Sequence, residues 1–253
     1  MRARRLLGLA TIVVLLLAWE VTARVGNNVY VPPPSQIAVT FAHEWFSPQF
    51  AHEAVPSIWR LLAGFVIAAI VGVALGVAIG VSDTLYRTLD PVLQVLRALP
   101  PTAVIPVGIL LLGIGDWMKV AVIVFGAIWP ILVNSVDGAR SVSSERLDTA
   151  RNFGFSRLET IVAVTFPSAL PQIFAGLRVG LALAFIMIVI SEMVGGSNGL
   201  GYAILSAQRT FSIPEMYAGI VLLAILGYGL NALFTLLERR VLAWHLGSTA
   251  VTR

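Results

Sequence analysis

The chain contains no cysteine among its 253 residues, and only 12% of its residues are charged. The absence of cysteine excludes a disulfide framework and a thiolate metal site. The charged fraction is about half of that in a soluble globular domain, in which roughly 25% of residues are charged. Because 58% of the residues are hydrophobic and gather in long runs, the composition predicts an all-α polytopic membrane protein.

The sequence also lacks the residue sets that support catalysis, metal binding or nucleotide binding. His43, His52 and His245 are scattered and have no metal-ligand spacing. There is no G-x-x-x-x-G-K-[ST] phosphate loop, and Gly199-x-Gly201 lacks the third glycine and the preceding strand of a dinucleotide site. We therefore predict no catalytic residue, metal site or cofactor on this chain. The net charge of +4 does not indicate nucleic-acid binding, because the arginines are spread over loops between apolar runs.

Apolar runs long enough to cross a bilayer predict about six transmembrane helices. The first, Leu6–Ala23, is either a retained span or a signal peptide with a weak cleavage site. Its length and Trp19 at its far end favour a retained span. The other predicted spans are Ser57–Val81, Pro91–Ile114, Val120–Val136, Pro171–Val194 and Met216–Leu237. The predicted domains are 1–56 (first span and outer segment), 57–237 (a five-helix core with a cytoplasmic loop at 138–171) and 238–253 (a cytoplasmic tail).

The segments between the spans are predicted to be short. Three prolines at 32–34 predict an extended stretch, and Ser35–Phe46 predicts a short amphipathic helix on the outer surface. Turns or loops are predicted at Ser82–Asp90, Gly113–Lys119 and Gly195–Pro214. The third span is the least regular, because Arg97, Pro100, Pro101 and Pro106 interrupt it. A helix that enters the membrane at a shallow angle fits this pattern.

Glycines in the second span are spaced by four and share one helix face: Gly72, Gly76 and Gly80. This spacing favours the close approach of a neighbouring helix, although glycine is frequent in membrane helices in general. Three further residues are candidates for a translocation path or gate. Glu192 is an acid within an apolar span, and it either contributes to a gate or subunit contact or reaches interfacial water. Trp129 and Asn134 lie about one turn apart, and they either line a pathway or pack against lipid and helices.

The basic residues indicate which side of the membrane each loop occupies. With both termini in the cytoplasm, the cytoplasmic set comprises Arg2, Arg4, Arg5, Arg87, Arg97, Arg140, Arg146, Arg151, Arg157, Arg239, Arg240 and Arg253. The set at or near the outside is smaller and comprises Arg24, Arg60, Lys119 and Arg209. This asymmetry is the positive-inside bias of membrane proteins. It predicts a multi-pass protein of the cell membrane whose longest charged loop faces the cytoplasm.

That loop, Ser143–Pro171, has the pattern of an ordered element. Apolar residues at helical spacing predict a first helix: Leu147, Ala150 and Phe153. Gly154 stands where a left-handed helix stop costs least. Ser156 and Glu159 form the pattern of a capping box that opens a second helix. Pro167 and Pro171 are expected to end that second helix. The alternative is a solvated loop that only joins two spans.

The same loop resembles the cytoplasmic loop of permeases in binding-protein-dependent ABC importers. Their pattern is E-A-A, three residues, G, nine residues, I-x-L-P. This chain has Asp148-Thr149-Ala150, then Gly154, then Val164 to Pro167, at the same spacing. Ala98–Gly115 and Ser191–Tyr202 are similar to segments of the nitrate, sulfonate and taurine subgroup. The coupling residues that the resemblance implies are Asp148, Thr149, Ala150, Gly154, Phe155 and Pro167.

The resemblance implies the fold of a type I ABC importer permease in the inner membrane, and it implies several partners. These are separate ATPase subunits that carry ATP and Mg, an extracytoplasmic solute-binding protein, and a second permease chain, in a homodimer or a pseudo-symmetric pair. The implied substrate is a small anion of the sulfonate, taurine or nitrate kind, or a small organic nutrient. An ion-coupled secondary transporter is the alternative. It predicts acids near the middle of the spans and an inverted repeat, neither of which is apparent.

Overall fold

The computed structural model describes residues 2–243, and the side chains of residues 10–243. His245, Arg253 and most of the predicted tail at 238–253 lie outside the described residues. The elements in chain order are α1 (Arg2–Gly26), α2 (Pro34–Trp45), η1 (Phe50–Ala54), α3 (Val55–Gly80), α4 (Asp83–Ala98), η2 (Pro101–Val104), α5 (Ile105–Leu112), α6 (Asp116–Arg140), α7 (Ser144–Asn152), α8 (Arg157–Thr160), η3 (Ile161–Thr165), α9 (Phe166–Gly195), α10 (Leu200–Arg209) and α11 (Ile213–Val241). Residues 2–243 contain no strand.

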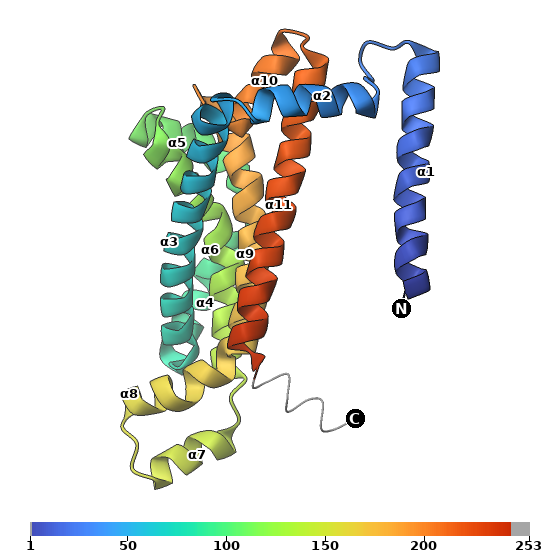
Figure 1. Cartoon of the computed structure of the whole chain (residues 1–253). Helices are drawn as coiled ribbons and strands as arrows, with labels where there is room; N and C mark the ends of the chain where they lie inside the picture. Colours follow the sequence, from blue (N-terminus) through green and yellow to red (C-terminus); the bar gives the residue numbers. More distant parts are fainter. Residues whose placement is uncertain (1, 244–253) are drawn as a thin grey trace.

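Four long helices, α3, α6, α9 and α11, run lengthwise through the molecule (Figure 1). α7 and α8 lie at one end of this bundle, called the α7 end, and α2 and α10 lie at the other, called the α10 end. α1 stands beside the bundle and joins it through α2. Ser35 ties α1 to α2, because its hydroxyl donates to Oε1 of Glu20 at 2.7 Å.

Four helical stretches in the described part are long and apolar enough to span a membrane: Phe50–Gly80, Asp116–Arg140, Arg157–Gly195 and Ile213–Val241. The bent pair of Asp83–Ala98 and Pro101–Leu112 would be a fifth. The remaining predicted span corresponds to α1, a helix of 25 residues. Ser35–Phe46 is also helical, as α2, so the predicted helix is confirmed, and its place on the outer surface stays a prediction.

The core lies where α6 packs between α3 and α9. A Cβ added to Gly76 on α3 would lie 2.5 Å from Cβ of Ser135 and 2.7 Å from the carbonyl oxygen of Leu132 on α6. Gly72 and Gly80 face the same helix. On the α9 side, a Cβ added to Gly176 would lie 2.6 Å from Cβ of Asn134. The glycines therefore let the three backbones approach closely, and buried aliphatic side chains fill the rest of the interface.

The third predicted span is not one helix. The turn predicted at Ser82–Asp90 is wrong, because Ser82 caps α4 by accepting from the N–H of Leu85 at 3.4 Å. Pro91 lies inside α4. The chain then bends by 84° between α4 and the segment that begins at Pro101. Two successive prolines at 100 and 101 disfavour the helical conformation there and explain the break.

The sequence analysis expected Pro167 and Pro171 to end the helix that follows Gly154, but neither proline ends it. α8, η3 and α9 form a continuous stretch from Arg157 to Gly195, 39 residues long. Pro167 directly follows η3 and Pro171 lies inside α9, so both prolines lie within the helical stretch. A wider π-helical turn, η3, precedes both prolines and keeps the backbone helical.

Two predicted loops contain helix. The segment Gly195–Pro214 contains α10, whose Leu200 and Ile204 are buried. The predicted turn Gly113–Lys119 ends early, because α6 already begins at Asp116. Lys119 is therefore helical, and it is buried rather than exposed on a turn.

Candidate functional site

The first candidate site is the element around Gly154 at the α7 end. Gly154 has φ of +77°, the left-handed conformation that the sequence predicts. The N–H of Phe155 donates to the carbonyl of Ala150 at 3.0 Å, and the N–H of Gly154 donates to the carbonyl of Arg151 at 2.9 Å. These two bonds are the Schellman pattern, so α7 ends at a defined residue and in a defined direction.

The predicted capping box opens the next helix, with Ser156, two residues after Gly154, as its N-cap. The N–H of Ser156 donates to Oε2 of Glu159 at 2.7 Å, and the N–H of Glu159 donates to the Ser156 hydroxyl at 3.3 Å. Because α8 continues through η3 into α9, the angle between α7 and α9 is set by this short connection. The loop is therefore an ordered helix–bend–helix element, and whether it does more than join two spans stays a prediction.

This element presents an apolar surface to solvent. Phe153 and Leu158 are 78% and 70% exposed, and Phe155 is also exposed. A cavity of about 370 Å³ lies between α7 and η3, lined by Thr149, Ala150, Phe153, Phe155 and Val164 among others. We call these exposed side chains and this cavity the coupling surface. Solvent-facing aromatic residues beside a cavity are typical of a protein-binding surface.

Polar contacts join the coupling surface to the bundle. Nη1 of Arg146 on α7 donates to the hydroxyl of Ser168 on α9 at 3.3 Å. Arg140, at the end of α6, pairs with Asp83 of α4 at 2.8 Å and lies over the ring of Tyr86, with 4.1 Å from Cζ to the ring centroid. Arg146 therefore joins α7 to α9, and Arg140 joins α6 to α4.

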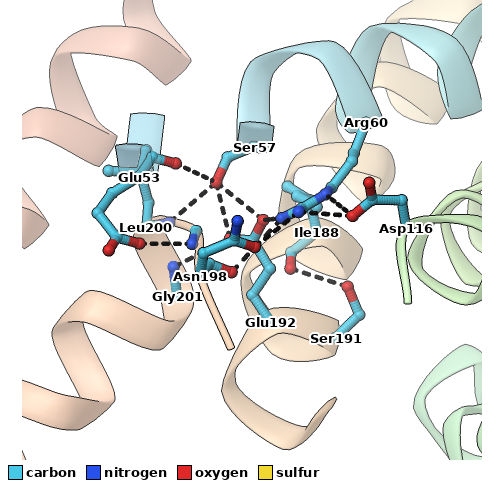
Figure 2. A network of polar contacts seen from close by, with 11 residues as sticks. Glu53, Ser57, Arg60, Asp116, Ile188, Ser191, Glu192, Asn198, Leu200 and Gly201 are labelled. Atoms are coloured by element: carbon cyan, nitrogen blue, oxygen red, sulfur yellow. Dashed lines mark hydrogen bonds and ion pairs between the residues drawn. The ribbon is translucent and has the colours of Figure 1, made fainter. Parts of the chain in front are cut away.

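The second candidate site is a buried polar network near the α10 end, shown in Figure 2. Its centre is Glu192, whose side chain is 0% exposed. Nη1 of Arg60 donates to Oε1 of Glu192 at 2.8 Å, and the hydroxyl of Ser57 donates to the same carboxylate at 2.8 Å. The N–H of Gly201 donates to Oε2 at 3.1 Å. Glu192 is thus held by α3 and by the start of α10.

Arg60 extends this network to α6 and to the segment before α10. Its Nη2 lies 2.6 Å from Oδ1 of Asp116 and donates to Oδ1 of Asn198 at 2.7 Å. Oε2 of Glu53 accepts from the N–H of Gly199 at 2.6 Å. The network therefore fixes the ends of three helices and the connection between α9 and α10 at one point.

The structure contradicts one of the two interpretations of Glu192, and a role in a gate or subunit contact stays a prediction. An acid that reaches interfacial water would be exposed, whereas this one is fully buried and paired, so that interpretation is wrong. Arg60 was placed only near the outside by the sequence analysis, yet it is 2% exposed and bridges two carboxylates. The sequence held one usable signal for it, because Arg60 is the only cation in the otherwise apolar run Ser57–Val81.

Trp129 and Asn134 lie on α6 but make different contacts. Asn134 donates from Nδ2 to the carbonyl of Pro130 at 2.8 Å and accepts from Nε2 of Gln172 on α9 at 3.1 Å. Trp129 packs edge-on against Phe125, with ring centroids 5.5 Å apart, and lines an apolar groove of about 680 Å³. The structure therefore puts Asn134 at a helix interface and Trp129 on a surface, and it brings neither into the network around Glu192.

The described residues contain no group of three or more His, Cys, Asp or Glu side chains placed to hold a metal ion. The family model described as "Binding-protein-dependent transport system inner membrane component" matches residues 64–243. The chain belongs to this family. It is a transport permease of the membrane, a component of a system that also has an ATPase and a solute-binding protein. The permease is 33% identical over 239 residues to the nitrate import permease protein NrtB of Synechocystis, covering 91% of this chain and 86% of the relative.

Other relatives agree with this family. The taurine transport system permease protein TauC of Escherichia coli is 29% identical over 246 residues, covering 94% of the permease and 90% of the relative. Among solved structures, a chain of the MetNI methionine ABC transporter in an inward-facing conformation matches with a TM-score of 0.59 and 21% identity. That match covers 73% of the permease and 94% of the MetNI chain, and it establishes the type I importer permease fold.

Proposed function

We propose that this permease is the membrane subunit of an ATP-driven importer, and that a separate ATPase subunit, carrying ATP and Mg, docks on the coupling surface. The observation that carries the proposal is the defined geometry at Gly154. The Schellman stop and the capping box hold α7 at a fixed angle to α9, and the Arg146–Ser168 contact joins the two helices. A rigid element with exposed aromatic residues can pass a rigid-body movement of the ATPase to the bundle.

The coupling surface faces the cytoplasm in this proposal, and both chain termini lie on that side. The basic residues of the α7 end support the orientation, because Arg140, Arg146, Arg151 and Arg157 all lie there. The positive-inside bias then places the α10 end outside the cell membrane. A solute-binding protein would deliver its ligand at the α10 end.

A second copy of the permease is proposed to complete the pathway. The apolar groove of about 680 Å³ between α3, α4, α5 and α6 supports this, because it is open and lined by large side chains such as Trp117, Phe125 and Trp129. A second copy packed over this groove would cover apolar side chains that would otherwise face lipid. Trp129 would then lie at the interface between the two copies and line the path.

The proposed substrate is a small anion of the sulfonate or nitrate class. The relatives named for nitrate and taurine transport support this class. The test is ATP-dependent uptake into proteoliposomes that contain the permease with its ATPase. With the matching binding protein present, taurine or nitrate uptake should depend on ATP. Uptake that follows an ion gradient and ignores ATP would instead support a secondary transporter.

A further inference from the structure

All charged side chains of α4 lie on one face of that helix. Together with Gln94 they are separated by alternating steps of four and three positions, which is the spacing of one face of an α-helix. We call this row the polar stripe, and its members are Asp83, Arg87, Asp90, Gln94 and Arg97. Because α4 and the segment after Pro101 together form a candidate membrane span, the polar stripe extends into a membrane-spanning part of the chain.

Arg97, the last member of the polar stripe, lies about half-way along the bundle. Four residues before it, Leu93 packs against the apolar cluster that contains Leu132 of α6. Four residues after it, Pro101 reaches Gly126 of α6, where an added Cβ would lie 3.6 Å from Cβ of the proline. Arg97 is therefore level with a point between these two contacts, which is near the middle of α6.

From this depth the guanidinium group of Arg97 does not reach a membrane surface. α4 begins at the α7 end, where Asp83 pairs with Arg140 of α6 at 2.8 Å. At 1.5 Å per residue, Arg97 lies about 21 Å further along the helix. Cationic side chains extend to the interface from positions near the ends of a span, and Arg97 is far from such a position. Its charge therefore stays within the membrane-spanning part of the bundle.

Arg97 is exposed, and no hydrogen bond or ion pair joins its side chain to another described residue. The acids of the polar stripe already have partners: Asp83 is ion-paired, and Asp90 accepts from Nε2 of Gln94 at 2.6 Å. Arg97 lies in the last turn of α4, where the helix C-terminus attracts a cation. This attraction is weak beside the cost of an unsolvated charge in hydrocarbon. The exposed side of Arg97 therefore needs water or an anion, and lipid chains supply neither.

We propose that the polar stripe faces a water-filled translocation path and that Arg97 binds the oxyanion group of the substrate as it passes. This inference rests on the proposed function, from which it takes the anionic substrate and the path. It adds the residue that makes the contact. A guanidinium group is planar and donates hydrogen bonds in pairs, which matches two oxygens of a sulfonate or nitrate group.

The first arm of the test measures which side of α4 meets water. The assembled importer, permease with ATPase, is placed in lipid nanodiscs, and labelling is read on the permease, which has no native cysteine. Gln94→Cys lies on the polar stripe, whereas Val95→Cys lies off it at nearly the same depth, at a position that is 67% exposed. A thiol in hydrocarbon does not ionise, so a hydrophilic thiol reagent should label Gln94→Cys at least about tenfold faster. Equal rates would overturn the inference.

The second arm measures the charge that Arg97 presents to the path. With Gln94→Cys as the reporter, a negatively charged reagent should react about tenfold more slowly after Arg97→Gln, and an uncharged reagent should change little. Added nitrate or taurine should slow the charged reagent only while Arg97 is present. If neither anion slows it, the contact is absent. If its rate follows the content of anionic lipid instead, Arg97 binds a lipid head group, and the inference is also overturned.

The third arm measures ATP-dependent uptake into proteoliposomes. Arg97→Gln loses charge-assisted hydrogen bonds to the substrate, so uptake should fall about tenfold. Arg97→Lys keeps the charge without the paired donors and should retain part of the loss-free rate. Arg87→Gln removes an equal charge from the polar stripe about 15 Å nearer the α7 end, and its effect should be smaller. Equal losses in the two glutamine variants, or full uptake in Arg97→Gln, would overturn the inference.

Failure of the proposed function gives a different result. If the unmodified complex takes up neither nitrate nor a sulfonate with ATP, the proposed function fails. The two labelling arms need no transport, so they still decide whether the polar stripe meets water and whether Arg97 attracts anions. The amount of ATPase that co-purifies with each variant shows whether the permease has folded, and the comparison of Gln94→Cys with Val95→Cys leaves Arg97 unchanged.

Discussion

Arg60 and Glu192 lie 132 positions apart in the chain and meet in an ion pair of 2.8 Å, with side chains that are 3% and 0% exposed. Each has further partners: Asp116 and Asn198 for the guanidinium, Ser57 and Gly201 for the carboxylate. A buried ion pair is tolerated when such additional hydrogen bonds satisfy both groups. The pair therefore behaves as one unit that joins α3 to α9.

The first prediction concerns removal of one member of this pair. Arg60→Met leaves two carboxylates without their cation and should lower the free energy of unfolding by about 3–5 kcal/mol. Glu192→Gln keeps a side chain that can accept from Ser57 and Gly201, and Arg60 keeps Asp116, so the loss should be smaller. The double variant should lose less than the sum of the two. Thermal unfolding of the purified permease measures all three.

An exposed pair provides the control for this series. Arg151 and Asp148 lie 3.2 Å apart with side chains 74% and 63% exposed, so Arg151→Met should change stability by less than about 1 kcal/mol. Uptake is measured in the same variants. If Glu192→Gln transports normally and the amount of permease in the membrane is unchanged, Glu192 has a structural role only and no role in a gate.

The second prediction concerns Gly154. A non-glycine residue at its φ of +77° costs about 1–2 kcal/mol, although an added Cβ would meet no atom within 4 Å. Gly154→Ala should therefore weaken ATPase association moderately, through the backbone alone. Gly154→Asp adds a charge to an apolar coupling surface and should abolish association and transport. Gly154→Asn should be the mildest change, because asparagine adopts the left-handed conformation more readily.

Co-purification of the ATPase with tagged permease, alongside uptake in the same cells, measures the Gly154 series. All three variants should insert into the membrane normally, because the substitution lies outside the spans. Full ATPase binding and full transport in Gly154→Asp would mean that this segment only connects two helices, and the coupling proposal would be lost.

The third prediction concerns close packing of α3 on α6. Gly76→Val places atoms where Cβ of Ser135 and the carbonyl of Leu132 already lie, so the helices must separate and stability should fall by about 2 kcal/mol or more. Gly229 on α11 has no atom within 4 Å of an added Cβ, so Gly229→Val is the control and should be close to neutral. Similar thermal stabilities of the two variants would contradict the packing argument.

The fourth prediction concerns orientation in the membrane. The chain has no native cysteine, so single cysteines can be introduced without prior changes. Ser197 near the α10 end and Ser144 at the α7 end are both exposed. In intact cells, Ser197→Cys should react with an impermeant thiol reagent, and Ser144→Cys should react only after the membrane is opened. The reverse pattern would invert the proposed topology.

The local features of the coupling surface follow from the sequence alone. Gly154, Ser156 and Glu159 act on backbone atoms within a few residues of themselves, so their spacing predicts the helix stop and the capping box directly. Most spans were also predicted, because each depends on a continuous apolar run. The predictions that rested on proline were the least accurate. Pro91 and Pro171 lie within helices, where neighbouring structure satisfies the backbone group that loses its hydrogen bond to a proline.

The partners of the buried charges, by contrast, become visible only when the helices are packed together. Whether Glu192 is exposed depends on what α3 and the start of α10 place beside it, and Arg60 is more than a hundred positions away in the chain. A sequence pattern reports neighbours along one helix, whereas the free energy of a buried charge depends on neighbours from other helices.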